Sequence, residues 1–215
     1  MTPALQRHTL LRLCRLAPVI PVLVVEEVAQ AVPLARALVA GGLPVLEVTL
    51  RTPAALEVIR AMATVPGARV GAGTVLSGHD AARAKAAGAE FAVAPGATPA
   101  LIDGCSAHGL PLMPGAATAS EVMALLERGY SMLKFYPAKG LGGTTTLSAL
   151  AGPLPRARFC PTGGITPETA PDYLAQANVV CVGGTWIAPP ATVASGDWDG
   201  IAARAKAAAA LARER

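Results

Sequence analysis

The sequence has no apolar run long enough to cross a membrane and little excess charge of either sign. A membrane-spanning helix needs about 18–20 apolar residues, but the most hydrophobic stretch, residues 10–27, is interrupted by Arg12, Arg15 and two prolines. No small-residue cleavage site follows a clean apolar block, as a secretory signal would require. The net charge of +4 comes without a basic run or interleaved aromatic residues. Neither a membrane nor a nucleic acid is therefore an expected partner.

The sequence also lacks the spacings of a disulfide framework or a metal site. Its four cysteines are far apart in the chain: Cys14, Cys105, Cys160 and Cys181. They are expected to be reduced core residues of a cytoplasmic protein. Its three histidines are scattered as well: His8, His79 and His108. No metal site is predicted, because metal ligands recur at short, regular spacings.

What the sequence does contain is an alternation of short apolar runs with Ala-rich helical patterns. Eight strands are expected: Val19–Val25, Val45–Leu50, Arg69–Val75, Phe91–Pro95, Leu110–Pro114, Ser131–Tyr136, Arg158–Thr162 and Val179–Gly183. Each strand–helix unit then has roughly 27 residues, a plausible length for a strand, a helix and two short loops. The alternation predicts a parallel α/β sheet. Eight units favour its closure into a (β/α)₈ TIM barrel over a doubly wound open sheet.

Helix signals complete this architecture. Typical helix starts are Thr52-Pro53, Thr98-Pro99, Thr166-Pro167, and Thr118 with Glu121. Residues 1–18 predict a short amphipathic N-terminal helix that closes one end of the barrel, and Asp197–Arg213 predict a last helix. Nothing resembles a linker, so residues 1–215 are expected to form a single domain.

Two of the expected strands carry charged residues in apolar surroundings. Side chains alternate between the two faces of a strand, so Glu47 and Arg51 share one face of residues 45–51 while the other face is aliphatic. The same rule turns Met132, Lys134 and Tyr136 away from the face of their strand that carries Leu133 and Phe135. Since the aliphatic faces should pack on the helices, all three charged side chains are expected to point into the barrel.

A buried lysine needs a reason, because burying an ammonium group is expensive. A structural ion-pair cluster is one interpretation. However, active sites of such barrels lie at the C-terminal ends of strands, where Arg51 falls. A partly desolvated lysine beside an arginine is driven towards its neutral amine, which can attack a carbonyl carbon. These residues favour a nucleophilic Lys134 and leave the structural ion pair open.

Glycines mark the ends of several strands. Gly71 and Gly73, ahead of Thr74, are expected to leave room for a ligand near the backbone. Gly pairs at residues 163–164 and 183–184 follow the seventh and eighth strands, where such barrels bind phosphate through backbone N–H groups. One such pair alone would also fit a tight turn.

The chain resembles the bacterial 2-keto-3-deoxy-6-phosphogluconate (KDPG) aldolases in five motifs: "VLEVTLRT", "VGAGTVL", "KFYPA", "FCPTGGI" and "CVGGTW". Those enzymes also act as 4-hydroxy-2-oxoglutarate (KHG) aldolases. The resemblance spans nearly the whole chain. It implies a class I Schiff-base aldolase of the Entner–Doudoroff pathway on a (β/α)₈ barrel. Such an enzyme takes a 2-keto acid and an aldehyde, is usually a homotrimer, and needs no metal or other cofactor.

The resemblance also implies a role for individual residues. The Schiff-base lysine would be Lys134 and the acid–base residue Glu47. The substrate-binding residues would be Arg51 and Thr74 at the carboxylate, Pro95 and Thr162 along the site, and Gly163, Gly164, Gly183, Gly184 and Thr185 at the phosphate. Two positions depart from the family: Tyr136 stands where phenylalanine is usual, and Thr185 where serine is usual.

Two alternative functions fit a phosphate-binding barrel. One is an isomerase or lyase without a covalent lysine, and the other is a non-catalytic phosphosugar-binding protein. Trapping with borohydride separates them from an aldolase, because only an imine is reduced to a stable adduct.

Overall fold

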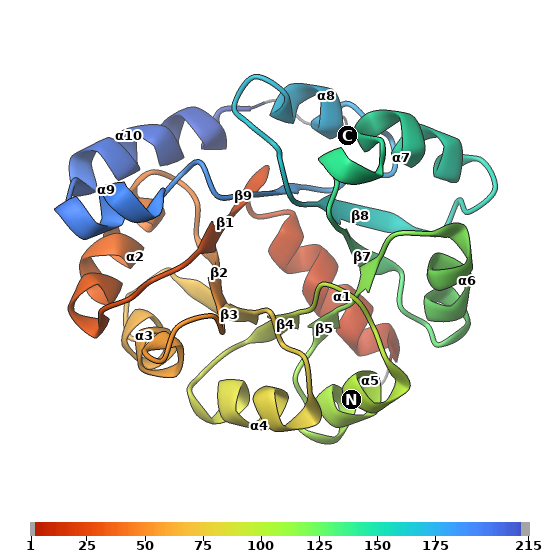
Figure 1. Cartoon of the computed structure of the whole chain (residues 1–215), viewed down its shortest axis with the longest axis horizontal. Helices are drawn as coiled ribbons and strands as arrows, with labels where there is room; N and C mark the ends of the chain where they lie inside the picture. Colours follow the sequence, from red (N-terminus) through yellow and green to blue (C-terminus); the bar gives the residue numbers. More distant parts are fainter. Residues whose placement is uncertain (1–2, 212–215) are drawn as a thin grey trace.

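Parallel strands alternate with helices along the computed structural model, which describes residues 3–211 (Figure 1). The strands are β1 (Val19–Leu23), β2 (Val45–Thr49), β3 (Arg69–Gly73), β4 (Phe91–Val93), β5 (Leu112–Met113), β6 (Gly115–Ala116), β7 (Met132–Phe135), β8 (Arg158–Pro161) and β9 (Val182–Gly184). The α-helices are α1 (Pro3–Cys14), α2 (Ala31–Ala40), α3 (Ala55–Met62), α4 (Gly78–Ala86), α5 (Pro99–Ala107), α6 (Ala119–Glu127), α7 (Gly143–Ala151), α8 (Ala170–Leu174), α9 (Pro190–Ser195) and α10 (Trp198–Ala209). Short 3₁₀ helices, η1 (Val28–Gln30) and η2 (Lys139–Leu141), follow β1 and β7.

The strands of the described residues form two parallel sheets, and α2–α10 lie around them (Figure 1). The larger sheet has the order β5-β4-β3-β2-β1-β9, and the smaller one has the order β6-β7-β8. Two isolated parallel bridges link β8 to β9. Phe159 of β8 pairs with Val179, which lies shortly before β9, and Thr162, which follows β8, pairs with Gly183 of β9.

The expected closed barrel of eight strands is therefore correct only in part. The strand expected at Leu110–Pro114 is divided into β5 and β6, which belong to different sheets. Pro114 lies between them, and a proline has no N–H group to donate to a ladder. Its carbonyl still accepts a hydrogen bond from the Lys134 N–H at 2.9 Å. The other expected strands are confirmed, with ends that differ by a few residues.

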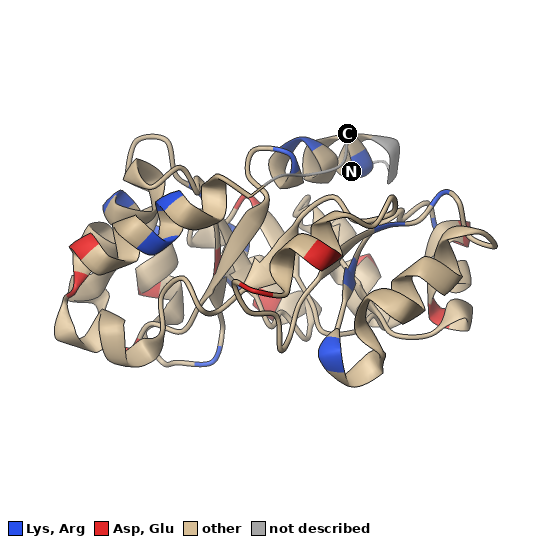
Figure 2. Ribbon diagram, turned by 90° about the horizontal axis from the view of Figure 1, so that it is seen from above, with Lys and Arg blue, Asp and Glu red and all other residues tan. Residues whose placement is uncertain are grey.

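Helix α1 covers the end of the molecule at which the strands begin (Figure 2). Its inner face packs with inward side chains of the strands in one apolar cluster, which we call the α1 cluster: Leu10, Leu13, Cys14, Ile20, Val45, Phe91, Val93, Met113, Met132, Cys160 and Cys181. Outward residues such as Leu46 and Val48 pack in a larger core under the helices. The helix expected within residues 1–18 is thus confirmed, although residues 1–2 lie outside the described part.

The helix starts predicted at Thr98 and Thr118 are confirmed, whereas those predicted at Thr52 and Thr166 are wrong by a few residues, since α3 begins at Ala55 and α8 at Ala170. The Thr98 hydroxyl accepts a hydrogen bond from the Leu101 N–H at 3.2 Å and caps α5. Thr118 and Glu121 form a reciprocal capping box on α6. The N–H of Ala117 and the N–H and hydroxyl of Thr118 donate to the Glu121 carboxylate and hold its pKa below the ordinary value.

The last helix, α10, begins after its N-cap Asp197. It was expected to run to Arg213, but it ends at Ala209, and residues 212–213 lie outside the described part. No helix within residues 3–211 is long and apolar enough to cross a membrane.

Candidate active site

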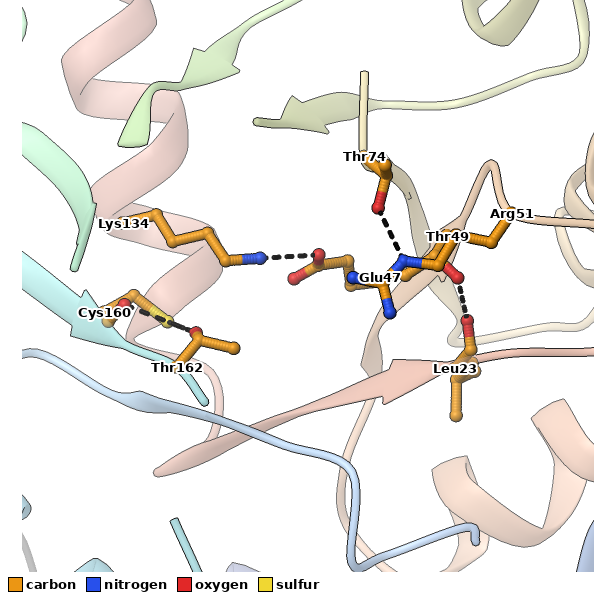
Figure 3. A network of polar contacts seen from close by, with 8 residues as sticks. All are labelled: Leu23, Glu47, Thr49, Arg51, Thr74, Lys134, Cys160 and Thr162. Atoms are coloured by element: carbon orange, nitrogen blue, oxygen red, sulfur yellow. Dashed lines mark hydrogen bonds and ion pairs between the residues drawn. The ribbon is translucent and has the colours of Figure 1, made fainter. Parts of the chain in front are cut away.

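Lys134 and Glu47 form an ion pair in the interior of the strands (Figure 3). Lys134 lies on β7 and Glu47 on β2, so the pair joins the smaller sheet to the larger one. The Lys134 Nζ donates to the Glu47 Oε1 at 3.1 Å. Only 7% of the Lys134 side chain and 2% of the Glu47 side chain are exposed. Both side chains point inward, as the alternation along the two strands predicts.

Glycines on β3 make room for the Glu47 carboxylate. A Cβ atom on Gly73 would overlap the Glu47 Oε1, and a Cβ atom on Gly71 would overlap the ring of Phe91. The sequence predicts that these glycines leave room for a ligand. In the structure, the side chains of Glu47 and Phe91 occupy that room instead. Gly73 therefore positions the Glu47 carboxylate, and the sequence around Gly73 does not predict this role.

The ring of Tyr136 lies beside the Lys134 ammonium group. Its centroid is 5.4 Å from the Lys134 Nζ, within the range of a cation–π interaction. The alternation along the strand predicts that Tyr136 shares the inward face with Lys134, and this contact agrees with that prediction.

The partner of Lys134 differs from the expected one. The sequence predicts a neighbouring arginine, but the described contact is with the Glu47 carboxylate, and Arg51 bonds to Thr74. The Glu47 carboxylate thus lies within hydrogen-bond distance of the Lys134 amine and can accept a proton from it.

Arg51 and Thr74 meet beyond the C-terminal ends of β2 and β3 (Figure 3). The Arg51 Nε donates to the Thr74 Oγ1 at 3.2 Å. The two Nη groups of Arg51 make no hydrogen bond or ion pair with other described residues, so they are free to bind a carboxylate. Thr74 has a φ of 57°, which is unusual for a β-branched residue and costs about 1–3 kcal/mol. Such strain is typical of residues whose position serves function.

Thr162 and Pro95 follow the ends of β8 and β4, on the same edge of the parallel strands. Thr162 is buried, and its hydroxyl donates to the carbonyl of Cys160 at 3.4 Å (Figure 3). Pro95 is exposed, and its carbonyl lies where a Cβ atom of Gly115 would be. The two sheets thus bring both predicted residues to the end that carries Arg51.

Gly163 and Gly164 form a loop after β8 that only glycine adopts easily. Their φ angles are 103° and 74°, both in the left-handed region. The Gly163 carbonyl accepts a hydrogen bond from the Lys139 N–H at 3.0 Å. The N–H groups of Gly163 and Gly164 donate to no other group within residues 3–211, so they can bind an anion.

Gly183 and Gly184 on β9 have packing roles that the sequence does not reveal. A Cβ atom on Gly183 would overlap the Thr162 hydroxyl, and one on Gly184 would overlap the indole of Trp186. Both glycines are therefore required for packing, whatever ligand binds near them. Thr185 follows them and is exposed.

Across residues 3–211, no group of three or more His, Cys, Asp or Glu side chains is placed to hold a metal ion. The four cysteines are free and buried. The chemistry available at this site is that of an amine, a carboxylate and a free guanidinium group.

The chain matches the family model "KDPG and KHG aldolase" over residues 11–204. It is 52% identical over 194 residues to the 2-dehydro-3-deoxy-phosphogluconate aldolase of Pseudoalteromonas atlantica, which covers 90% of both chains. It is 49% identical to the KHG/KDPG aldolase of Escherichia coli, over 89% of this chain and 90% of the relative. A crystal structure of the Legionella pneumophila KDPG aldolase, with pyruvate captured as a covalent carbinolamine intermediate, superposes with a TM-score of 0.90 at 42% identity, over 93% of this chain and 98% of that one.

Proposed function

The chain belongs to the KDPG and KHG aldolase family, and we propose on this basis that it cleaves KDPG to pyruvate and glyceraldehyde 3-phosphate through an imine at Lys134. We propose KHG, cleaved to pyruvate and glyoxylate, as a second substrate. The observation that carries this proposal is the buried Lys134–Glu47 pair at 3.1 Å. Family membership does not favour the isomerase or the non-catalytic barrel.

Imine formation uses the two partners of the ion pair. Lys134 passes a proton to Glu47, and the neutral amine then adds to the C2 carbonyl of the 2-keto acid. Glu47 returns the proton to the hydroxyl group of the carbinolamine, which leaves as water. A protonated imine remains on Lys134, and Glu47 is again a carboxylate.

Cleavage uses the imine as an electron sink. The Glu47 carboxylate, directly or through a water, removes the proton of the C4 hydroxyl. The C3–C4 bond breaks, its electron pair moves into the imine to give an enamine, and the aldehyde leaves. The enamine is protonated at C3, and water hydrolyses the pyruvyl imine to release pyruvate and free Lys134.

Arg51 and Thr74 would bind the carboxylate of the 2-keto acid. The free Nη groups of Arg51 suit a bidentate pair with a carboxylate, and the bond from its Nε to Thr74 holds the guanidinium in place. Pro95 and Thr162 would line the site between this carboxylate and the aldehyde end.

The loops after β8 and β9 would bind the substrate phosphate. The free N–H groups of Gly163 and Gly164 support this role. We propose that Gly183, Gly184 and Thr185 complete the site through backbone N–H groups and the Thr185 hydroxyl.

We also propose that the two sheets together act as one (β/α)₈ barrel. Only Pro114 separates β5 from β6, and the two isolated bridges link β8 to β9. A single catalytic domain over residues 1–215, a homotrimer, a cytoplasmic location and catalysis without a metal or other cofactor follow from the family resemblance. Sedimentation of the purified protein at several concentrations tests the trimer.

Trapping with pyruvate and borohydride tests the proposed chemistry. We expect one reduced pyruvyl group per chain, mapped to Lys134 by mass spectrometry of peptides. Lys139 is the matched control, since it lies five residues on and is exposed. Lys139→Gln should still be trapped, and Lys134→Met should not. An adduct on Lys139, or none at all, would overturn the mechanism.

A further inference from the structure

A cavity lies beside the start of β7 and β8, at the opposite end of β8 from Thr162. Its volume is about 440 Å³, within the range of small-molecule sites. Arg7 of α1, Ser131 just before β7, and Arg156 and Arg158 around the start of β8 line it. It thus lies near the end of the strands that α1 covers.

The lining of this cavity is strongly positive. It contains three arginines and no acidic residue. Within the described part of the chain, none of these arginines forms an ion pair. Three guanidinium groups without counter-charges raise the local positive potential, and that potential attracts anions.

Two features of the cavity lining favour anion binding. The Arg158 Nη1 donates to the carbonyls of Pro155 at 2.9 Å and Ala157 at 2.8 Å, so its guanidinium is held against the loop. The Ser131 hydroxyl is buried and has no hydrogen-bond partner among residues 3–211. A buried hydroxyl without a partner is costly, and a rotation that turns it towards the cavity would let it donate to an anion oxygen.

We propose that this cavity binds a small polyanion, a phosphorylated or polycarboxylate metabolite. The guanidinium group of an arginine forms the same bidentate hydrogen bonds with phosphate and with carboxylate oxygens, so this lining can bind either kind of ligand. A ligand with two or more anionic groups could pair with guanidinium groups from both α1 and β8. The site is separate from Lys134, which lies further along β7, and it does not depend on the aldolase proposal.

Calorimetric titration of the full-length protein with pyrophosphate and with citrate tests this site. Arg7→Gln and Arg156→Gln should each raise the Kd about tenfold or more, because a hydrogen bond to a charged group is lost. Arg36→Gln on α2 is the matched control: it also removes one exposed positive charge, and the Kd should change less than about twofold. All three variants should keep the aldol-cleavage activity of the unchanged protein.

The outcomes separate the possibilities. Tighter binding of pyrophosphate assigns the site to phosphorylated ligands, and tighter binding of citrate assigns it to polycarboxylates. The proposal fails if neither anion binds at millimolar concentration. It also fails if Arg7→Gln and Arg156→Gln leave binding unchanged, since the anion then binds elsewhere. If Arg36→Gln weakened anion binding as much as the other two variants, the effect would depend only on the net charge of the protein, and the proposal would fail.

Discussion

Two inward-facing side chains of β7, only two residues apart, lie in opposite environments. Met132 packs in the apolar α1 cluster, whereas Lys134 forms a buried ion pair with Glu47. The same contrast holds on β2, where Val45 belongs to the α1 cluster and Glu47 lies two residues further along. Inward residues at the start of the strands stabilise the fold, and inward residues further along supply the chemistry. Stability and catalysis should therefore respond separately to substitutions at the two ends.

The largest expected effect comes from replacing Lys134 on β7, with a replacement of Met132 on the same strand as the control. Lys134→Met should lower aldol cleavage by about 10⁴–10⁶-fold, because the nucleophile is lost. Met132→Leu keeps the volume in the α1 cluster and should cost under about 1.5 kcal/mol of unfolding free energy, with turnover unchanged. Steady-state kinetics and urea unfolding measure both effects. If Met132→Leu reduced turnover as much as Lys134→Met, stability and catalysis would not be assigned to different ends of the strands.

A smaller loss is expected when Glu47 keeps its shape but cannot accept a proton. Glu47→Gln should reduce turnover by about 10²–10⁴-fold, the usual contribution of general acid–base catalysis. Slow trapping of pyruvate by borohydride should survive, since Lys134 and Arg51 remain. Near-normal turnover would mean that another group carries the proton and that Glu47 only pairs with a buried cation.

Two glycines on β3 provide a matched pair for the same comparison. In Gly73→Ala the new methyl group would overlap the Glu47 carboxylate, and a displacement of about 1 Å can cost about 10²-fold in turnover. In Gly71→Ala it would overlap the Phe91 ring of the α1 cluster, which should cost about 1–3 kcal/mol of stability instead. Kinetics at a temperature where both variants are folded separate the two effects. Equal kinetic damage from both would remove Gly73 as a positioning residue.

The buried thiols of the α1 cluster are expected to make the free energy of unfolding depend on pH without affecting catalysis. Hydrogen bonds with Cys14 and Cys160, together with burial, raise the pKa of Cys181 well above 9.0. The folded protein therefore keeps this proton at a pH at which the unfolded chain releases it. The stability it contributes is complete below the unfolded pKa and declines as the pH rises towards the folded pKa.

Unfolding by urea at a series of pH values from 8 upwards measures this decline. Cys181→Ala should show a shallower decline than the unchanged protein. Identical slopes would mean that Cys181 does not contribute to it.

The smallest effect concerns Thr185 at the proposed phosphate site. If its methyl group crowds the phosphate, Thr185→Ser should improve kcat/KM for KDPG by up to ~1 kcal/mol, about fivefold, and leave KHG unchanged. This substitution is a better test than Gly184→Val, whose side chain would collide with Trp186 rather than with a ligand. A gain for both substrates would place Thr185 outside the phosphate site.

Local sequence patterns predict much of this molecule. Alternation along β2 and β7 places Glu47 and Lys134 in the interior, and Thr98 and Thr118 cap α5 and α6 as expected. These features depend only on residues that are near one another in the chain. The division of the fifth strand also has a local cause in Pro114, although the hydrogen-bonding partners of each half do not.

Contacts between distant segments could not be predicted in this way. Arg51 bonds to Thr74 and not to Lys134, and Gly73 makes room for the Glu47 carboxylate.

Which side chains turn inward follows from the order of the residues, because a strand alternates with a period of two residues whatever surrounds it. What each inward side chain contacts depends on how distant segments pack together. Arg7 and Arg158 share a cavity although 151 positions separate them, and Lys134 finds its carboxylate 87 positions away. Such neighbours are set by how the close-packed interior is filled, and no local pattern encodes that filling.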